Sequence, residues 1–295
     1  SIARIPDNLK KILKGGNYVS AVDENRFQGE RHFVTLMPSP KNKHLLLSRH
    51  DGDLKRSVVE LINLNTKETI HTWKPDVNKI NSFSKFKKKW PNLYRDNNLF
   101  RYQMYNPMLL KNGELLIHGH LTPLTKIGLC SNMIWNIDYI FHHSITKDEL
   151  NFWAPFTYIP ASVNPGLDEQ KGSRTELFID DGIMQFNSEG KVLFKKSIIQ
   201  IFLDNGMEEH ILGPGEPVYD PIHLNDIQPV LFDGDFFKKG DLFLSLRHLS
   251  MIVLYRPSEN KIVWYKQYPW RLHHDVDILN DHQISIFNNK RIVHN

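Results

Sequence analysis

Three segments of the chain, residues 141–145, 221–227 and 272–279, each place a histidine at the start of an alternating strand pattern. The histidines are His143, His223 and His274. An imidazole titrates near neutral pH, so a cluster of histidines can mix neutral and charged members. A neutral member can act as a nucleophile or a base, while a charged one binds an anion. The recurrence predicts a repeat architecture whose equivalent positions converge on one site.

Arg247 adds a cation to this pattern. It follows the strand pattern of residues 241–246, within the same unit as His223. The planar guanidinium suits a tetrahedral oxyanion such as sulfate or phosphate. Because an arginine would repel a metal cation, three histidines with an arginine favour an oxyanion-transfer site over a metal cage.

A single histidine at the start of a strand is more often a hydrogen-bonded structural residue. Its recurrence at three equivalent positions favours a function. Asp226 and Asp275 are expected to orient an imidazole or to cap a turn. Arg49, which precedes a histidine as Arg247 does, is interpreted as an echo of repeat symmetry.

The composition favours a folded chain with a substantial core. Of 295 residues, 40% are hydrophobic and 11% aromatic, and the net charge is only +4. The densest basic run, residues 85–89, is interpreted as a solvated surface, so no nucleic-acid partner is predicted. Cys130 is the only cysteine, so no internal disulfide can form. No apolar run approaches the roughly 20 residues that span a bilayer.

Short strand patterns separated by turns fill most of the chain from residue 33 onward. They group into meanders of up to four strands that repeat about every 40 to 50 residues, which is typical of a β-propeller. Five units are visible and the last is incomplete. A sandwich or an irregular barrel is the alternative. Residues 1–32 are predicted to be an N-terminal segment and residues 33–295 the propeller domain, with irregular excursions at residues 75–104 and 198–222.

Four short motifs, in this order and in this strand context, resemble the arylsulfate sulfotransferase family. The motifs are residues 223–227, residues 240–247, residues 262–264, and residues 274–276 with 284–289; the double histidine at 142 and 143 adds to them. The likeness covers about residues 105–290. It implies a six-bladed all-β propeller in the bacterial periplasm or cell envelope. The implied activity moves a sulfuryl group from a phenolic sulfate ester to another phenol, with no cofactor and no nucleotide sulfate donor.

The same resemblance assigns roles to single residues. It places the nucleophilic histidine at His274, the supporting histidines at His143 and His223, and the arginine at Arg247. A sulfohistidine would form at His274 and then pass its sulfuryl group to the acceptor phenol. Three residues within or next to these motifs, His273, Asn225 and His248, are expected to bind substrate.

Two other functions remain open at this point. One is a catalytically silent propeller that binds a sulfated or aromatic ligand or a partner protein. The other is a metal-dependent hydrolase or lyase that uses the three histidines as ligands.

Overall fold

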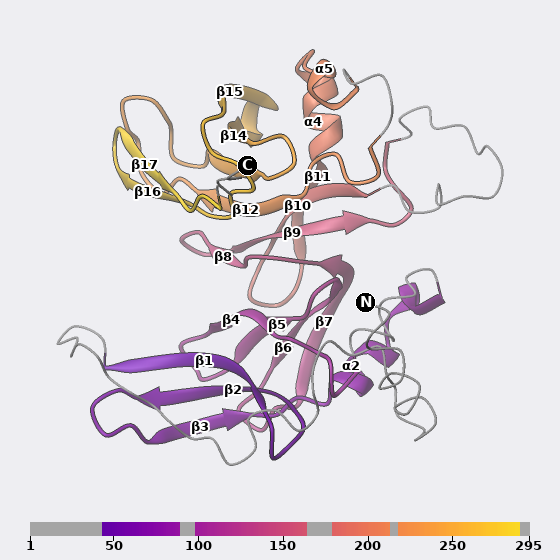
Figure 1. The fold of residues 1–295 in the computed structure, drawn as a ribbon, viewed down its shortest axis with the longest axis vertical. Helices are drawn as coiled ribbons and strands as arrows, with labels where there is room; N and C mark the ends of the chain where they lie inside the picture. The colour runs from indigo at the N-terminus through magenta and orange to yellow at the C-terminus, as the bar shows by residue number, and fades with distance from the viewer. Residues whose placement is uncertain (1–42, 89–97, 164–178, 213–217, 290–295) are drawn as a thin grey trace, which may run out of the picture.

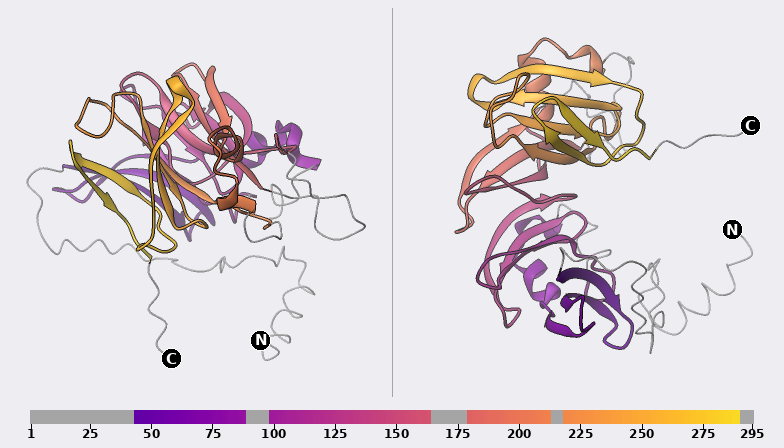
Figure 2. Two further views of the ribbon diagram at one scale, coloured as in Figure 1. Left: turned by 90° about the horizontal axis from the view of Figure 1, so that it is seen from above. Right: turned by 90° about the vertical axis from the view of Figure 1, so that its left-hand side faces the viewer.

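The computed structural model describes residues 43–88, 98–163, 179–212 and 218–289. These residues form antiparallel meanders that follow one another in sequence and lie in an arc (Figures 1 and 2). The predicted N-terminal segment, residues 1–32, lies outside the described residues.

The first two meanders occupy the N-terminal half of the chain. The first is β1 (His44–Asp51), β2 (Arg56–Asn63) and β3 (Thr69–Trp73). The second is β4 (Tyr105–Leu109), β5 (Leu115–His118), β6 (Thr122–Ile127) and β7 (Met133–Phe141).

Three meanders follow. The third is β8 (Thr146–Lys147), β9 (Phe152–Tyr158), β10 (Asp180–Phe186) and β11 (Val192–Ser197), joined to the second through β7 and β9. The fourth is β12 (Leu224–Pro229), β13 (Leu242–Leu246), β14 (Met251–Arg256) and β15 (Lys261–Gln267). The fifth is β16 (Val276–Asn280) and β17 (Gln283–Ile286).

The apolar clusters show how these sheets pack. Each of the four larger clusters joins residues of two successive meanders, so the sheets pack face to face around the arc. In β5, Leu115 and Ile117 belong to the cluster shared with the first meander, while Leu116 belongs to the one shared with the third. Because successive side chains of a strand point to opposite faces, such a strand must be apolar on both. This is the packing of propeller blades, and the predicted all-β propeller is confirmed.

The opening strands of the meanders lie next to one another. β1 contacts β4, and β12 contacts β8, β9 and β16. Residues that precede β8, β12 and β16 are therefore brought together although they are far apart in the sequence. The five predicted units, the last with two strands, match the described sheets, while the blade number of six stays a prediction.

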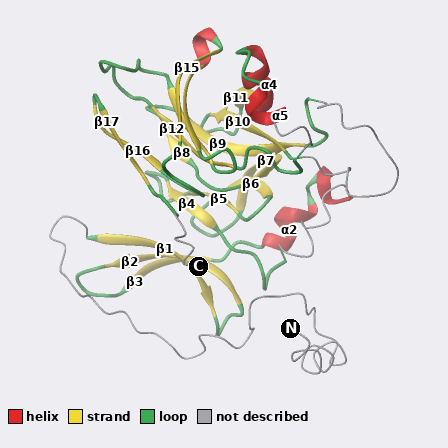
Figure 3. Cartoon of the chain, turned by 45° about the horizontal axis from the view of Figure 1, so that its top comes forward, coloured by secondary structure: helices red, strands yellow, loops and turns green. Residues whose placement is uncertain are grey.

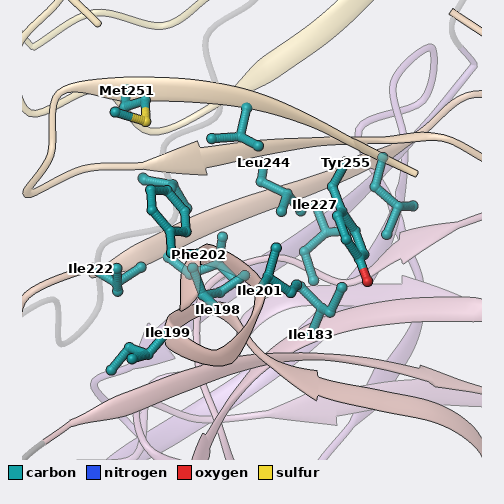
Figure 4. Packing of buried hydrophobic residues seen from close by; sticks show 14 of the residues in the cluster. Ile183, Ile198, Ile199, Ile201, Phe202, Ile222, Ile227, Leu244, Met251 and Tyr255 are labelled. Carbon is teal, nitrogen blue, oxygen red and sulfur yellow. The ribbon is translucent and has the colours of Figure 1, made fainter. Parts of the chain in front are cut away.

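The predicted excursions contain short helices that lie along one side of the sheets (Figure 3). Residues 75–104 include α2 (Val77–Ser82) and η2 (Lys85–Lys88), and a further turn, η4 (Pro257–Glu259), links β14 to β15. The apolar start of the second excursion is α4 (Ile198–Asp204), followed by α5 (Glu209–Leu212). Ser197 caps α4, since its side chain accepts a hydrogen bond from the Gln200 amide. The helix buries Ile198, Ile201 and Phe202 against the third and fourth meanders (Figure 4).

Candidate active site

The fold positions the three predicted histidines at equivalent places. His143 lies between β7 and β8, His223 directly precedes β12, and His274 precedes β16 by two residues. The ring centroids of His143 and His223 are 5.2 Å apart, and those of His143 and His274 are 6.2 Å apart. The three imidazoles therefore converge, as the sequence analysis predicted.

The backbone at two of these positions is unusual. His143 has φ = 59° and His223 has φ = 51°, in the left-handed region that L-residues rarely occupy. Residues in such conformations cluster at functional sites, where the surrounding structure holds them. Here the carbonyl of His143 accepts a hydrogen bond from the side-chain amide of Asn106, and the carbonyl of His223 accepts one from the backbone N–H of Arg247.

His274 is the imidazole with the fewest constraints. Neither of its ring nitrogens has a hydrogen-bond partner among the described residues, and its backbone N–H donates to the carbonyl of Phe287. Burial lowers the pKa of His274, and the charges of Arg247 and His223 lower it further. The ring is therefore neutral at neutral pH and carries an uncommitted lone pair, which is what a nucleophile requires.

His143 is also held neutral, but one of its ring nitrogens already has a hydrogen-bond partner. Its Nδ1 lies 2.8 Å from Nδ1 of His142. Burial lowers the pKa of His143 far below its ordinary value, and the neighbouring imidazoles, His142 first among them, add to the effect. The second ring nitrogen of His143 is left to face the other histidines or a ligand.

His223 is oriented by an aspartate that the sequence analysis did not single out. Oδ2 of Asp220 lies 2.6 Å from Nδ1 of His223, and Oδ1 of the same carboxylate accepts the His223 backbone N–H at 3.1 Å. This pair of bonds fixes the ring and places its proton on Nδ1. The spacing of three residues within Asp220–His223 is the local signal that could have identified Asp220.

Arg247 and His248 complete this side of the site. Nη1 of Arg247 donates to Nε2 of His248 at 3.1 Å, and Nδ1 of His248 donates to the carbonyl oxygen of Asp220 at 2.6 Å. The His248 ring lies 4.5 Å from that of His223. Nε of Arg247 is buried without a hydrogen-bond partner, and Arg247 forms no ion pair with a carboxylate among the described residues.

A cavity of about 660 Å³ adjoins the imidazoles, a volume in the usual range for a small-molecule site. His143 and His274 line it, together with Asn225, two carboxyl groups and an aromatic wall that includes Tyr105 and Phe287. His223 and Arg247 are not among the lining residues, but the ring centroid of His223 lies 5.2 Å from that of His143, which does line the cavity.

The residues predicted to bind substrate are placed differently from one another. Asn225 lines the cavity and donates to the carbonyl of His273, while its own side-chain oxygen is buried without a partner. His248 is in the Arg247 network described above. His273 has no exposed surface, and its Nε2 lies 3.2 Å from the carbonyl of Met251. Its ring therefore points into the fourth meander, so the expected substrate contact is replaced by a structural role.

The histidines of the metal alternative do not form a compact ligand set. Among the described residues, one group of three has ligand atoms within 4.8 Å of one another, and it consists of Asp220, His223 and His248. Those ligand atoms are already engaged in the hydrogen bonds above, and the Arg247 guanidinium lies against His248. This donor set suits an anion beside it better than a cation within it.

Two more polar groups lie at the site: Asp181, which sequence reasoning missed, and Asp226, which was expected to orient an imidazole or to cap a turn. Asp181 is buried and contacts His142, and Asp226 is a buried carboxyl on the cavity wall. The hydroxyl of Ser144 donates to Asp226 at 2.7 Å. Nothing local marks Asp181, because it lies in β10 and meets His142 only through the pairing of sheets.

The fold and the site together define a β-propeller in which three imidazoles converge where its blades meet, beside an arginine that forms no ion pair among the described residues. A family model described as Arylsulfotransferase (ASST) matches residues 106–295. The chain belongs to the arylsulfotransferase family. No curated protein matches the chain.

Several solved structures are similar in fold. The β-propeller domain of Cps50 (Swd1) from Myceliophteria thermophila shares 6% identity over 83% of this chain and 62% of that one, with a TM-score of 0.43. BamB from Moraxella catarrhalis shares 10% sequence identity over 81% of this chain and 66% of that one, with a TM-score of 0.35. BBS1N in complex with ARL6DN shares 8% sequence identity over 73% of this chain and 62% of that one, with a TM-score of 0.29. The chain spans less than two thirds of each.

Among the described residues, no helix is long and apolar enough to cross a membrane.

Proposed function

We propose that this protein transfers a sulfuryl group from an aryl sulfate ester to an acceptor phenol, through a covalent intermediate on His274. The observation that carries the proposal is the neutral, unpartnered ring of His274, which lines the cavity 6.2 Å from the ring of His143 and within the field of Arg247. Membership of the arylsulfotransferase family supports it.

The first half-reaction is a displacement at sulfur. The lone pair of His274 forms the N–S bond while the S–O bond to the donor phenol breaks, and the phenolate leaves with the bonding electrons. Negative charge on the sulfuryl oxygens is balanced by Arg247 and by N–H groups of the neighbouring imidazoles. The leaving phenolate takes a proton from a neighbouring acid.

The second half-reaction reverses these steps with a different phenol. The acceptor oxygen attacks sulfur, the N–S bond breaks, and the acceptor proton passes to the group that protonated the first phenolate. His274 returns to its neutral state. The enzyme then needs no cofactor, because the donor ester supplies the sulfuryl group already activated.

The cavity favours this use of the site. It has a volume of about 660 Å³, enough for an aryl sulfate, and Tyr105 and Phe287 contribute to its aromatic wall. Donor and acceptor would bind there in turn, which predicts ping-pong kinetics. The compartment follows from the resemblance alone, and we propose the periplasm or cell envelope.

The test is an intact-mass measurement after mixing the protein with 4-nitrophenyl sulfate and no acceptor. We expect one added sulfuryl group and a burst of 4-nitrophenol equal to the enzyme concentration. His274→Ala should show neither. His282→Ala is the matched control, because His282 lies in the same meander with an exposed side chain, and it should react like the parent. A parent protein that releases no phenol and gains no mass would overturn the proposal.

A further inference from the structure

His143 has a second imidazole and a buried carboxylate behind it. Nδ1 of His143 lies 2.8 Å from Nδ1 of His142, and Nε2 of His142 lies 3.1 Å from Oδ1 of Asp181. His142 is 4% exposed and Asp181 is 2% exposed. The three groups therefore form a continuous chain that runs from the interior to the candidate active site.

The carboxylate at the inner end of this chain is strongly held in its ionised form. Besides His142, it accepts hydrogen bonds from the Thr157 hydroxyl at 3.2 Å and from the Leu224 amide at 2.8 Å. Burial alone would raise the pKa of Asp181, but the interaction with His142 and the hydrogen bond from the Leu224 backbone N–H outweigh it, and the pKa is lowered. Asp181 is thus a fixed negative charge beside His142.

The contact between the two imidazoles constrains their protons. Two ring nitrogens 2.8 Å apart must share one proton, since two lone pairs or two N–H groups would repel each other. Nε2 of His142 must carry a proton as well, because its partner is a carboxylate. Only two arrangements satisfy both conditions while His143 stays neutral.

In the first arrangement His142 carries protons on both nitrogens and donates to Nδ1 of His143, so the proton of His143 is on Nε2. In the second arrangement His142 is neutral, His143 donates from Nδ1, and Nε2 of His143 carries a lone pair. The two states differ by one proton. In the first His143 can give a proton at Nε2, and in the second it can accept one there.

From this geometry we infer that Asp181 and His142 are positioning residues that let His143 act as the acid and then the base of sulfuryl transfer. This inference rests on the proposed function and adds the proton path to it. When the first S–O bond breaks, Nε2 of His143 gives its proton to the phenolate, and the proton between the rings moves from His142 to His143. When the acceptor phenol attacks, both movements reverse, so the protons balance over one cycle.

The arrangement has a clear physical advantage. His143 is held neutral by burial and by its imidazole neighbours, so a charge on its own ring would be costly. The relay places that charge on His142, next to the Asp181 carboxylate, instead of beside His274 and Arg247. The same carboxylate binds the amide of Leu224, the residue after His223, and so ties the third and fourth meanders together where the imidazoles meet.

The first test measures how the rate of sulfuryl transfer to His274 depends on the leaving group. For Asp181→Asn we expect single-turnover adduct formation from phenyl sulfate to fall about 100-fold, because its phenolate needs a proton. With 4-nitrophenyl sulfate, whose phenolate leaves unprotonated, the fall should be much smaller. An equal loss with both donors would show that Asp181 serves structure alone and would overturn the inference.

A matched control separates this effect from damage to the interior. Thr157→Val removes another buried hydrogen bond to the same carboxylate oxygen without touching His142. It should leave the ratio of the two donor rates as in the parent. Failure of the proposed function would look different, because the parent itself would then form no adduct with either donor.

A second measurement needs no variant in the interior. In protein labelled with ¹⁵N in its histidines, nitrogen shifts report which ring nitrogens carry protons, and His143→Asn identifies the signals of that ring. In the resting enzyme we expect His142 protonated on both nitrogens and His143 protonated on Nε2 only. A resting enzyme with His142 neutral would overturn the inference, whatever its activity.

Discussion

Among the described residues, two arginines precede a histidine at the end of a strand, and the structure uses them in opposite ways. Arg49 lies in β1 of the first meander, and Arg247 follows β13 of the fourth. Arg49 donates to both carboxylate oxygens of Glu60 at 2.8 Å and to Asp51 at 2.9 Å. Arg247 meets no described carboxylate and donates instead to an imidazole.

The difference lies in what surrounds each guanidinium. Two carboxylates balance the charge of Arg49, so this side chain links β1 to β2 and attracts an anionic ligand only weakly. The charge of Arg247 is uncompensated, and its effect reaches His274, whose pKa it helps to lower. An arginine without a carboxylate partner can bind an anion, whereas the charge of a paired arginine is already balanced.

The largest expected effect comes from removing the uncompensated charge. Arg247→Gln should lower the rate of sulfuryl transfer to His274 by about 100-fold or more, since one charged donor to the transferring oxygens is lost. Its unfolding temperature should change little, because no carboxylate loses a partner. The measurement is single-turnover formation of the His274 adduct, with thermal unfolding recorded on the same sample.

The matched variant in the first meander should give the reverse result. Arg49→Gln leaves Glu60 and Asp51 without their partner, and both are 8% exposed. We expect a loss of about 1 to 3 kcal/mol in the free energy of unfolding and no change in the rate per folded molecule. If Arg49→Gln slowed adduct formation as much as Arg247→Gln, the contrast between the two arginines would be wrong.

A smaller effect is expected from Asp220, whose carboxylate lies beside His223 and His248. Asp220 binds His223 rather than the guanidinium, so its task is to orient an imidazole. Asp220→Asn should lower the rate about 10- to 100-fold, as for other residues that orient a functional side chain. Single-turnover formation of the His274 adduct measures this rate, and a rate equal to that of the parent would assign Asp220 to structure only.

Most of the fold can be predicted from the sequence, and individual strands show why. Residues such as Leu115, Leu116 and Ile117 read as a strand because both faces of β5 are buried. The sequence pattern does not predict the strand β6, because Pro123 and two threonines interrupt its apolar residues. The helix α4 was taken for part of an irregular excursion, because an apolar run of its length fits a strand or a helix equally well.

The site was predictable only where its residues repeat. His143, His223 and His274 share a position at the head of a meander, so the fold that predicts the repeat also predicts their meeting. Asp181 has no such regularity, and its contact with His142 depends on how β7, β9 and β10 pair. His273 differs from its neighbour: His274 lines the cavity, whereas the ring of His273 is buried, with its Nε2 3.2 Å from the carbonyl of Met251.

The last prediction tests the same contrast through pH, because the pKa of Asp226 in the active-site region and the pKa of Asp51 in the first meander shift in opposite directions. Burial raises the pKa of Asp226 to about 7, and the charge of Asp275 beside it adds to the shift. Burial would also raise the pKa of Asp51, but the Leu54 amide and Arg49 outweigh it and the pKa is lowered. Asp226 therefore favours the folded state below pH 4 and loses that contribution as pH rises toward 7, whereas Asp51 loses its contribution as pH falls below 4.

These signs predict two different pH profiles of unfolding. Asp226→Asn mimics the protonated carboxyl, so it should match the parent near pH 4 and become more stable than the parent by pH 8, by about 1.4 kcal/mol for each unit of pKa difference at most. Asp51→Asn should be less stable than the parent at pH 8, with the gap closing near pH 3. Urea unfolding of the three proteins across this range measures both trends. If the stability of the two variants relative to the parent depended on pH in the same way, Asp226 would be balanced by nearby charges as well as Asp51 is. The distinction between Arg247 and Arg49 would then rest on geometry alone.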